Sequence, residues 1–164
     1  MTLAEAAARA DGLAQQGSER ELAQLRSQWD DELESSVRSS DYRDRAVAYR
    51  AIGQFRFRQK LELLRRGFDD ESPACRGSAL LSLELLSRDH PGAINADRSL
   101  LHTVATNPEE NAAVRRLAIM CLKNGSPQRD TIVILDGLAA DDEQDRELRA
   151  AAKRVAELLK RKAR

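Results

Sequence analysis

The amino-acid sequence predicts an all-α protein, an α-solenoid of antiparallel helix pairs, and three observations lead to this prediction. Leucine and alanine, which favour helices, dominate the apolar residues, and aromatic residues make up only 4% of the chain. Residues that start and stop helices recur at short intervals along the sequence. One motif occurs four times at a spacing typical of stacked helical repeats.

The repeated motif is an arginine followed by alanine three residues later and by an apolar residue seven residues later. Successive motif arginines lie 31, 39 and 34 residues apart. Residues at these spacings share one helix face, so the alanine lets a neighbouring helix approach and the apolar residue fills the core. Acidic residues precede each arginine, where they suit the positive end of a helix. The four copies are Arg45–Ala48–Ile52, Arg76–Ala79–Leu83, Arg115–Ala118–Leu122 and Arg149–Ala152–Ala156.

This acidic start followed by Arg-x-x-Ala-x-x-x-apolar resembles the first helix of HEAT-like repeats, in particular the short repeats of the phycobilisome-lyase type. The resemblance covers residues 41–164. It implies a right-handed solenoid of about three and a half repeats, in which second helices line a concave binding face. The motif residues then form a structural ladder that sets the packing of the first helices, and the arginines are not a substrate site.

Helix-end signals divide the chain into nine expected helices. The signals are capping boxes, N-cap residues followed by proline, and glycines at helix ends. They are Thr2 with Glu5, Ser18 with Glu21, Ser72-Pro73, Asn107-Pro108, Ser126-Pro127, and Gly17, Gly53, Gly67 and Gly125. The expected helices are 3–16, 19–38, 42–53, 56–67, 73–88, 96–106, 108–123, 127–139 and 143–161.

Residues 1–40 lack the motif, and we expect them to form a helical hairpin that caps the repeat array of residues 41–164 in one compact domain. The second expected helix carries a narrow apolar stripe, Leu22, Leu25, Trp29, Leu33 and Val37. Such a stripe also fits a coiled-coil arm, a partner-binding arm or a self-association surface. Trp29, the only tryptophan, would anchor any of these contacts.

The charge balance argues against nucleic acid or an anionic membrane as the partner. The chain has 27 basic and 27 acidic residues, so no global field attracts nucleic acid or an anionic membrane. The amino terminus does not have the pattern of a secretory signal. No apolar run approaches the ~20 residues that span a bilayer. We therefore expect a cytoplasmic protein without a membrane segment.

No sequence motif indicates a catalytic, cofactor-binding or metal-binding site. Two cysteines, Cys75 and Cys121, are too few for a disulfide framework, and we expect them to be buried thiols. His90 and His102 have no partners at metal-ligand spacing.

Asp141, Glu143 and Asp145 begin like a calcium-binding loop, but the later positions that need glycine and glutamate hold Arg146 and Ala152. We therefore interpret the acidic clusters as helix starts and expect no enzyme activity. HEAT-like proteins also include bilin lyases and enzymes that remove alkylated bases from DNA. No residue of this chain supports the first activity, and the scarcity of aromatic residues disfavours the second.

The leading hypothesis is a non-enzymatic scaffold or adaptor that binds a protein partner on the concave face. The candidate contacts lie on second helices and are Arg58, Glu62, Arg65, Arg98, His102 and Arg129. The competing interpretation of these residues is an ordinary solvated helix face.

The alternative function is nucleic-acid binding through two basic segments. These are Arg50, Arg56, Arg58, Lys60, Arg65 and Arg66, and Lys153, Arg154, Lys160, Arg161, Lys162 and Arg164. We expect a monomer or a weak homo-oligomer.

Overall fold

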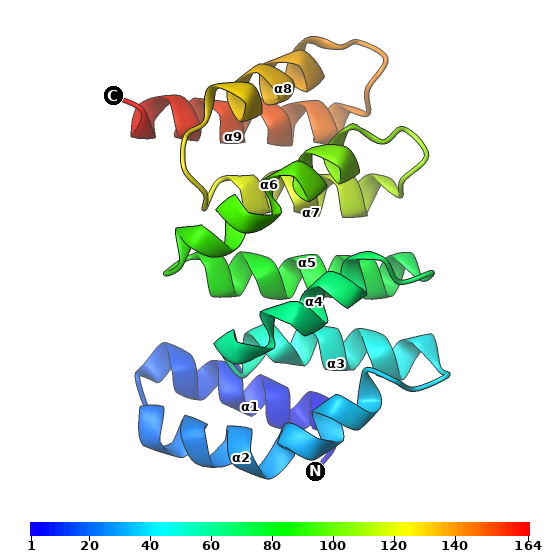
Figure 1. The fold of residues 1–164 in the computed structure, drawn as a ribbon, viewed down its shortest axis with the longest axis vertical. Coiled ribbons are helices and arrows are strands. Elements are labelled where there is room, and N and C mark those ends of the chain that lie inside the picture. Colours follow the sequence, from blue (N-terminus) through cyan, green and yellow to red (C-terminus); the bar gives the residue numbers. More distant parts are fainter. The chain divides into compact units, whose positions relative to one another are not determined.

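The computed structural model describes all residues 1–164, and it confirms the predicted all-α class (Figure 1). It contains nine α-helices, one short 3-10 helix and no strand. None of the helices combines the length and apolarity that a bilayer crossing requires. The elements are α1 Leu3–Gln16, α2 Glu19–Ser36, α3 Tyr42–Gln54, η1 Arg58–Lys60, α4 Leu61–Phe68, α5 Pro73–Ser87, α6 Pro91–Thr106, α7 Ala112–Leu122, α8 Arg129–Ala140 and α9 Arg146–Lys162.

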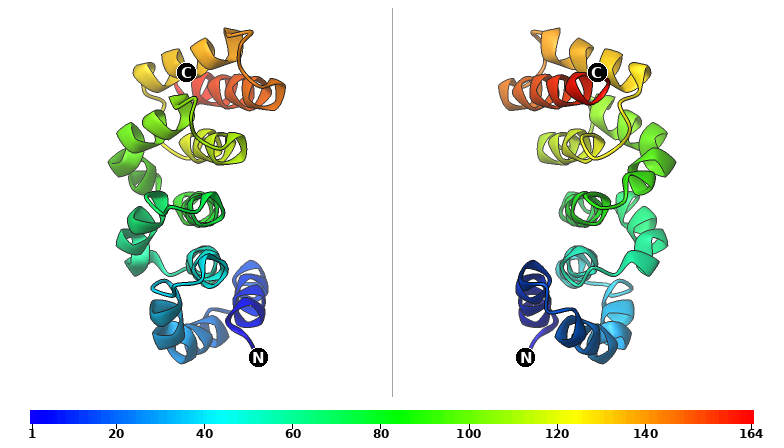
Figure 2. Two further views of the ribbon diagram at one scale, coloured as in Figure 1. Left: turned by 90° about the vertical axis from the view of Figure 1, so that its right-hand side faces the viewer. Right: turned by 90° about the vertical axis from the view of Figure 1, so that its left-hand side faces the viewer.

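The chain forms two compact units, residues 1–86 and residues 87–164. In the first unit, α1 and α2 form an antiparallel hairpin, and both of its helices pack against α3. Helices α3 and α5 lie side by side and run in the same direction (Figures 1 and 2). The chain returns between them through α4. The largest fully buried side chains of this unit are Tyr49, Phe55, Phe57, Leu22, Leu33, Ile52, Leu64, Leu80 and Leu83.

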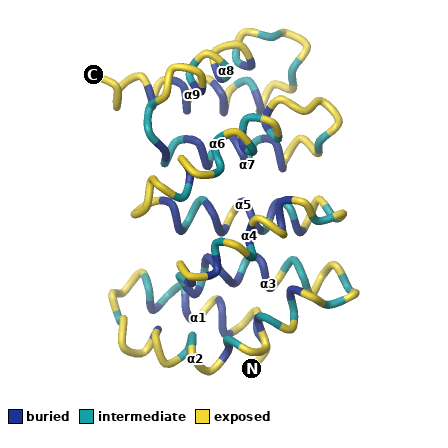
Figure 3. Tube along the Cα trace, viewed as in Figure 1, coloured by how far each residue is buried: buried dark blue, intermediate teal, exposed yellow.

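In the second unit, residues 87–164 form two layers of helices (Figure 2). Helices α7 and α9 pack side by side in one layer, and α6 and α8 lie in the other. The neighbours α6–α7 and α8–α9 are closely packed antiparallel pairs. In each unit the buried residues recur along the helices as stripes, separated by exposed turns (Figure 3). The apolar periodicity of the sequence therefore gives each helix one buried face.

The first helix begins and ends where the sequence predicts. The Thr2 hydroxyl accepts a hydrogen bond from the Glu5 backbone N–H at 3.2 Å, and the Glu5 carboxylate accepts one from the Thr2 N–H at 3.1 Å. Gly17 ends the helix with a left-handed φ of 75°, which glycine adopts without steric cost. The second predicted capping box is wrong, because the Ser18 side chain makes no capping hydrogen bond.

Two of the three N-cap–proline predictions are also wrong. α5 does begin at Pro73, but α7 starts after Asn111 and α8 starts after Gln128. In the loop before α7, the Asn107 side chain accepts from the Glu109 N–H at 3.0 Å, and Asn111 caps the helix instead. An asparagine or serine before proline favours a tight turn as well as a helix start, and here the turn is formed.

Three further helix starts differ from the prediction, and one of them is that of α9, which begins at Arg146 and not at residue 143. The expected helix 56–67 begins later, with η1 and then α4, because Arg56 adopts a left-handed φ of 59° that breaks the helical path. The expected helix 96–106 begins earlier, at Pro91, which occupies the first helical turn.

Gly53 and Gly67 each lie one residue before the end of their helix, within one residue of the predicted ends, but neither has the positive φ of a left-handed cap. A Cβ on Gly67 would lie 2.7 Å from the Cβ of Ala79, so this glycine allows α4 to approach α5. Gly125 does follow α7, yet its φ is not positive. A Cβ there would lie 2.6 Å from a methyl carbon of Ile94, so close packing selects glycine at this position too.

Candidate interaction surfaces

The motif arginines bind carbonyl groups of the segments that lead into their own helices. Arg115 donates from Nε to the Ala105 carbonyl at 3.0 Å, and Arg149 donates in the same way to the Ala139 carbonyl at 3.4 Å. In the first unit, Arg45 donates to the Ser39 carbonyl at 3.0 Å and Arg76 to the Asp70 carbonyl at 2.7 Å. These contacts support the structural role expected for the four arginines.

Two of these arginines also reach the polar loop before the next motif helix. Arg45 forms a two-pronged ion pair with Asp70, with an Nε–Oδ2 distance of 2.9 Å and an Nη2–Oδ1 distance of 3.1 Å. Arg115 donates from Nη2 to the Gln144 side-chain oxygen at 3.0 Å. Each contact links a motif helix to the loop before the next motif helix of the same unit.

Electrostatics reinforce the pair between Arg45 and Asp70. Burial alone would raise the pKa of Asp70, but hydrogen bonds from Arg45 and from the Ser72 N–H outweigh it and hold the pKa below its usual range. The hydrogen bond to Asp70 in turn raises the pKa of Arg45. Both groups are therefore charged at neutral pH.

The alanines and apolar residues of the ladder are all buried, as a packing role requires. Every alanine at the third position after a motif arginine has no exposed surface, and the apolar residues at the seventh position are at most 1% exposed. These residues are Ala48, Ala79, Ala118 and Ala152, and Ile52, Leu83, Leu122 and Ala156.

In the first unit the candidate contacts lie on η1 and α4. Arg58, Glu62 and Arg65 are all exposed. Arg65 and Glu62 form an ion pair with a distance of 2.5 Å, three residues apart on the helix. Surface pairs of this kind contribute little to stability, so both charges can re-pair with a partner at small cost.

In the second unit the candidate contacts lie on α6 and α8. Arg98 donates to the Asn95 side chain, and the His102 Nε2 lies 2.8 Å from the hydroxyl oxygen of Thr131. Thr131 is buried, whereas His102 is half-buried and Arg129 is exposed. The structure therefore brings His102 to the contact between the two helices, close to the exposed start of α8.

Burial lowers the pKa of His102 below its usual value. The nearby Asp130 carboxylate opposes this shift and Arg98 adds to it. The imidazole is therefore neutral at pH 7 and protonates only under more acidic conditions.

Part of the first basic segment is neutralised by acidic residues. Lys60 is buried, and its Nζ lies 2.7 Å from the Asp30 carboxylate and 2.6 Å from that of Glu34. Arg56 pairs with Asp11 at 2.8 Å. These cations are therefore not displayed as a continuous phosphate-binding surface.

The role of Lys60 is one that sequence reasoning missed. Its ammonium also lies 4.9 Å from the centre of the Phe57 ring, which adds a cation–π contact. Burial would lower the pKa of Lys60, but the hydrogen bonds to Asp30 and Glu34 outweigh it and raise the pKa. The four-residue spacing of Asp30 and Glu34 on one helix face was the available signal, although it does not name the cation between them.

The carboxyl-terminal basic segment is partly engaged as well. Lys160 pairs with Asp136 at 3.0 Å, and Lys162 donates to the carbonyl groups of Lys123 and Gly125. Lys153, Arg154, Arg161 and Arg164 are exposed.

The structure assembles no group of three or more histidine, cysteine or acidic side chains suited to a metal ion. Cys75 and Cys121 are buried and unpaired with each other. Burial raises the pKa of the Cys75 thiol, which lowers its reactivity as a nucleophile. The acidic group at Asp141 forms a turn, in which Asp141 accepts from the Glu143 N–H at 3.0 Å, and Asp145 caps α9.

Comparison with known proteins adds no family to this description. No protein-family model, curated protein or solved structure matches the chain.

Proposed function

We propose that this protein is a non-enzymatic scaffold or adaptor, built as a HEAT-like solenoid, that binds a protein partner through its second helices. The layered packing of α7 with α9 and of α6 with α8 supports the repeat architecture. So do the equivalent carbonyl contacts of Arg115 and Arg149. The same arginine–carbonyl hydrogen bond at the same motif position is expected of repeats that stack on their neighbours.

The observation that carries the binding proposal is the contrast between the two kinds of helix. Motif arginines donate to backbone carbonyl groups of their own unit, whereas Arg58, Glu62 and Arg129 are exposed on η1, α4 and α8. In the second unit Arg98, His102 and Arg129 come from two neighbouring helices of one layer. A rigid surface with charges of fixed position favours selective recognition of a complementary protein surface.

A charge-reversal experiment tests this proposal. The tagged protein is used to capture partners from native lysate, beside the double variant Arg98→Glu/Arg129→Glu and a matched control, Arg154→Glu/Arg161→Glu, on the exposed side of α9. We expect a partner that is captured by the wild type and the control but lost with the double variant. Equal capture by all three proteins would place the partner surface elsewhere.

Nucleic acid is tested as the competing ligand in the same series. Fluorescence anisotropy with labelled DNA and RNA at low salt should give no binding, since Arg56 and Lys60 of the first basic segment are paired with acids. Binding that weakens steeply with salt would overturn the protein-partner proposal in favour of nucleic acid.

A further inference from the structure

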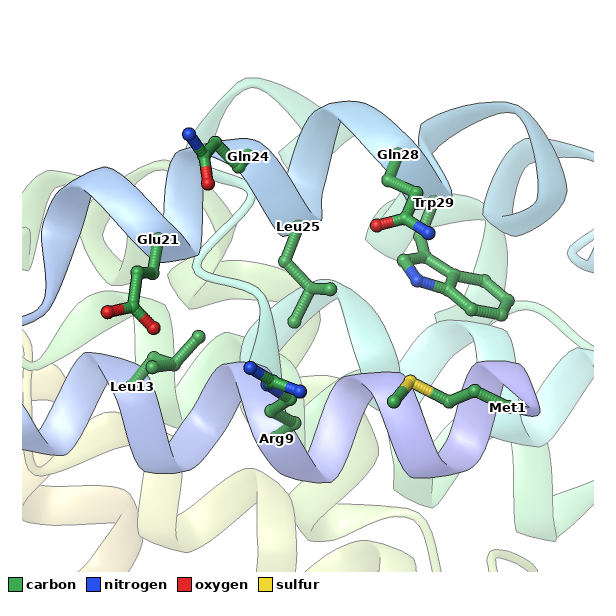
Figure 4. A pocket seen from close by; sticks show the side chains of 8 residues that line it. All are labelled: Met1, Arg9, Leu13, Glu21, Gln24, Leu25, Gln28 and Trp29. Carbon is green, nitrogen blue, oxygen red and sulfur yellow. The ribbon is translucent and has the colours of Figure 1, made fainter.

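A pocket of about 330 Å³ lies between the two helices of the amino-terminal hairpin (Figure 4). Its volume is at the lower end of the range of small-molecule sites. Its lining is mixed, with apolar and polar side chains from both helices. The lining residues are Met1, Arg9, Leu13, Glu21, Gln24, Leu25, Gln28 and Trp29.

The indole N–H of Trp29 is an unusual element of this pocket. Trp29 is only 8% exposed, and its Nε1 is buried without a hydrogen-bond partner in the protein. Figure 4 shows the nitrogen-bearing edge of the ring on the side of the pocket. Buried donors without an acceptor are rare in native proteins because leaving one unpaired is unfavourable. An acceptor atom of a molecule bound at this edge of the ring would pair with this donor.

A positive charge lines the same pocket. Arg9 is exposed on α1, its side chain makes no ion pair or hydrogen bond within the protein, and it lies between the Trp29 end and the Glu21 end of the pocket (Figure 4). A guanidinium group prefers a carboxylate as its partner, and a carboxylate also accepts from an indole N–H. Glu21 lies near Leu13, at the end of the pocket away from Trp29.

Apolar side chains provide the remaining contacts. Leu25 projects from α2 toward the middle of the pocket, and Met1 lies near Trp29 (Figure 4). Met1 and Gln28 are exposed and have flexible unbranched side chains, so their rotation can open access to the indole edge. Burying a short hydrocarbon chain against these residues is favourable in proportion to the area removed from water.

We propose that this pocket binds a small amphipathic carboxylate. The carboxylate oxygens accept from Arg9 and from the Trp29 Nε1–H, and the apolar chain lies against Leu25 and Leu13. The same chemistry occurs in a free short-chain carboxylic acid and in the carboxyl terminus of an apolar peptide. The inference is independent of the scaffold proposal, since none of the second-helix candidate contacts lines this pocket.

The single tryptophan makes the test specific. In ¹⁵N-labelled full-length protein, the indole N–H gives one resolved signal, which is followed during titration with octanoate below its micelle concentration. We expect a saturable shift of this signal and of the backbone amides of α1 and α2. Octanamide, which has the chain without the charge, and acetate, which has the charge without the chain, should each bind at least about tenfold more weakly.

Two variants separate the contributions of the pocket residues. Arg9→Gln should weaken octanoate binding about tenfold, and the matched control Arg20→Gln, at an exposed position of α2 outside the pocket, should not. Trp29→Phe keeps the aromatic packing and removes the donor, and it should weaken binding about fivefold as measured on the backbone amides. Heteronuclear spectra of each variant show whether the fold is retained.

The source of the carboxylate is decided by a second probe, acetyl-Ala-Ala-Leu with a free carboxyl terminus. Tighter binding of this peptide than of octanoate identifies a peptide terminus as the ligand, and the reverse identifies a free acid. Either result supports the proposal. It is overturned if neither probe shifts the indole signal, if octanamide binds as tightly as octanoate, or if Arg9→Gln has no effect.

Discussion

The backbone of Gly53 in α3 is in direct contact with Ser82 of α5. The Gly53 N–H donates to the Ser82 Oγ at 2.9 Å, and the Ser82 hydroxyl donates to the Tyr49 carbonyl, the usual helical partner of that N–H. A Cβ placed on Gly53 would lie 2.7 Å from the Cα of Ser82. Ser82 is thus inserted into the hydrogen-bond ladder of α3, and only glycine leaves room for it.

This contact predicts that Gly53→Ala destabilises the protein. Alanine favours a helix over glycine by about 1 kcal/mol, but here the new methyl group meets backbone atoms that cannot move independently. We expect a net loss of about 1–3 kcal/mol in the free energy of unfolding, the range of overpacked cores. Urea unfolding followed by circular dichroism measures it.

Gly12→Ala is the matched control for the same substitution. Gly12 lies within α1, and a Cβ at this position meets no atom within 4 Å. The variant should therefore be more stable than wild type by about 0.5–1 kcal/mol. Equal effects of the two substitutions, in either direction, would show that the α3–α5 contact is not as close as described.

The depressed pKa of Asp70 predicts a pH-dependent contribution of its ion pair with Arg45. A carboxyl group whose pKa is lower in the folded state stabilises the fold above the unfolded pKa of ~3.9, and the contribution is lost as pH falls through the folded value. Asp70→Asn should therefore lower the melting temperature by roughly 5 °C or more at pH 7. The difference from wild type should shrink in strongly acidic buffer.

Asp69→Asn is the control for this pair, because Asp69 is exposed and is the neighbouring carboxylate in the chain. It should melt close to the wild-type temperature at every pH. A deficit for Asp70→Asn that is the same at pH 7 and at pH 2 would contradict the assigned role of the charge.

The lowered pKa of His102 predicts how stability changes with pH. The direction is opposite to that of a salt-bridged histidine. Because the folded state binds the proton less tightly than the unfolded chain, stability is fully present above pH ~6.5 and declines as pH falls toward the folded pKa. The slope should not exceed about 1.4 kcal/mol per pH unit. His102→Gln should remove this part of the slope between pH 5 and pH 7, as measured by urea unfolding at each pH. An unchanged slope would show that His102 is protonated as easily in the fold as in the unfolded chain.

The sequence predicted the helices well because their signals are local. Capping at Thr2, the left-handed Gly17 and the buried alanines each depend on a few neighbouring residues. Two glycines have a role that is not local. Gly53 and Gly67 lie one residue before the ends of their helices, but their close packing is set by Ser82 and Ala79, residues of another helix.

The candidate surfaces were less predictable for the same reason. Exposure of Arg58 and Arg129 follows from helix periodicity and could be anticipated. The burial of Lys60 among two carboxylates could not, because it depends on how α2 meets the chain near η1. Nor could the pocket beside Trp29, since the sequence marks Trp29 as part of an apolar stripe and says nothing of its unpaired nitrogen.

The cluster around Lys60 supports a last prediction, that Lys60→Met destabilises the protein although methionine fits an apolar environment. Loss of the ammonium leaves Asp30 and Glu34 facing each other on one helix face. Both carboxylates are partly solvated, so we expect a loss of about 1–2 kcal/mol, less than for a fully buried pair. Lys153→Met, at an exposed position of α9, is the control and should change stability by less than about 0.5 kcal/mol.

Since the pKa of Lys60 is raised in the fold, its contribution to stability is complete below pH ~10.4 and is lost as pH rises through the folded value. Urea unfolding of both variants at pH 8 and pH 11 checks this, and a Lys60→Met protein as stable as wild type at pH 8 would show that the cluster contributes nothing to the fold.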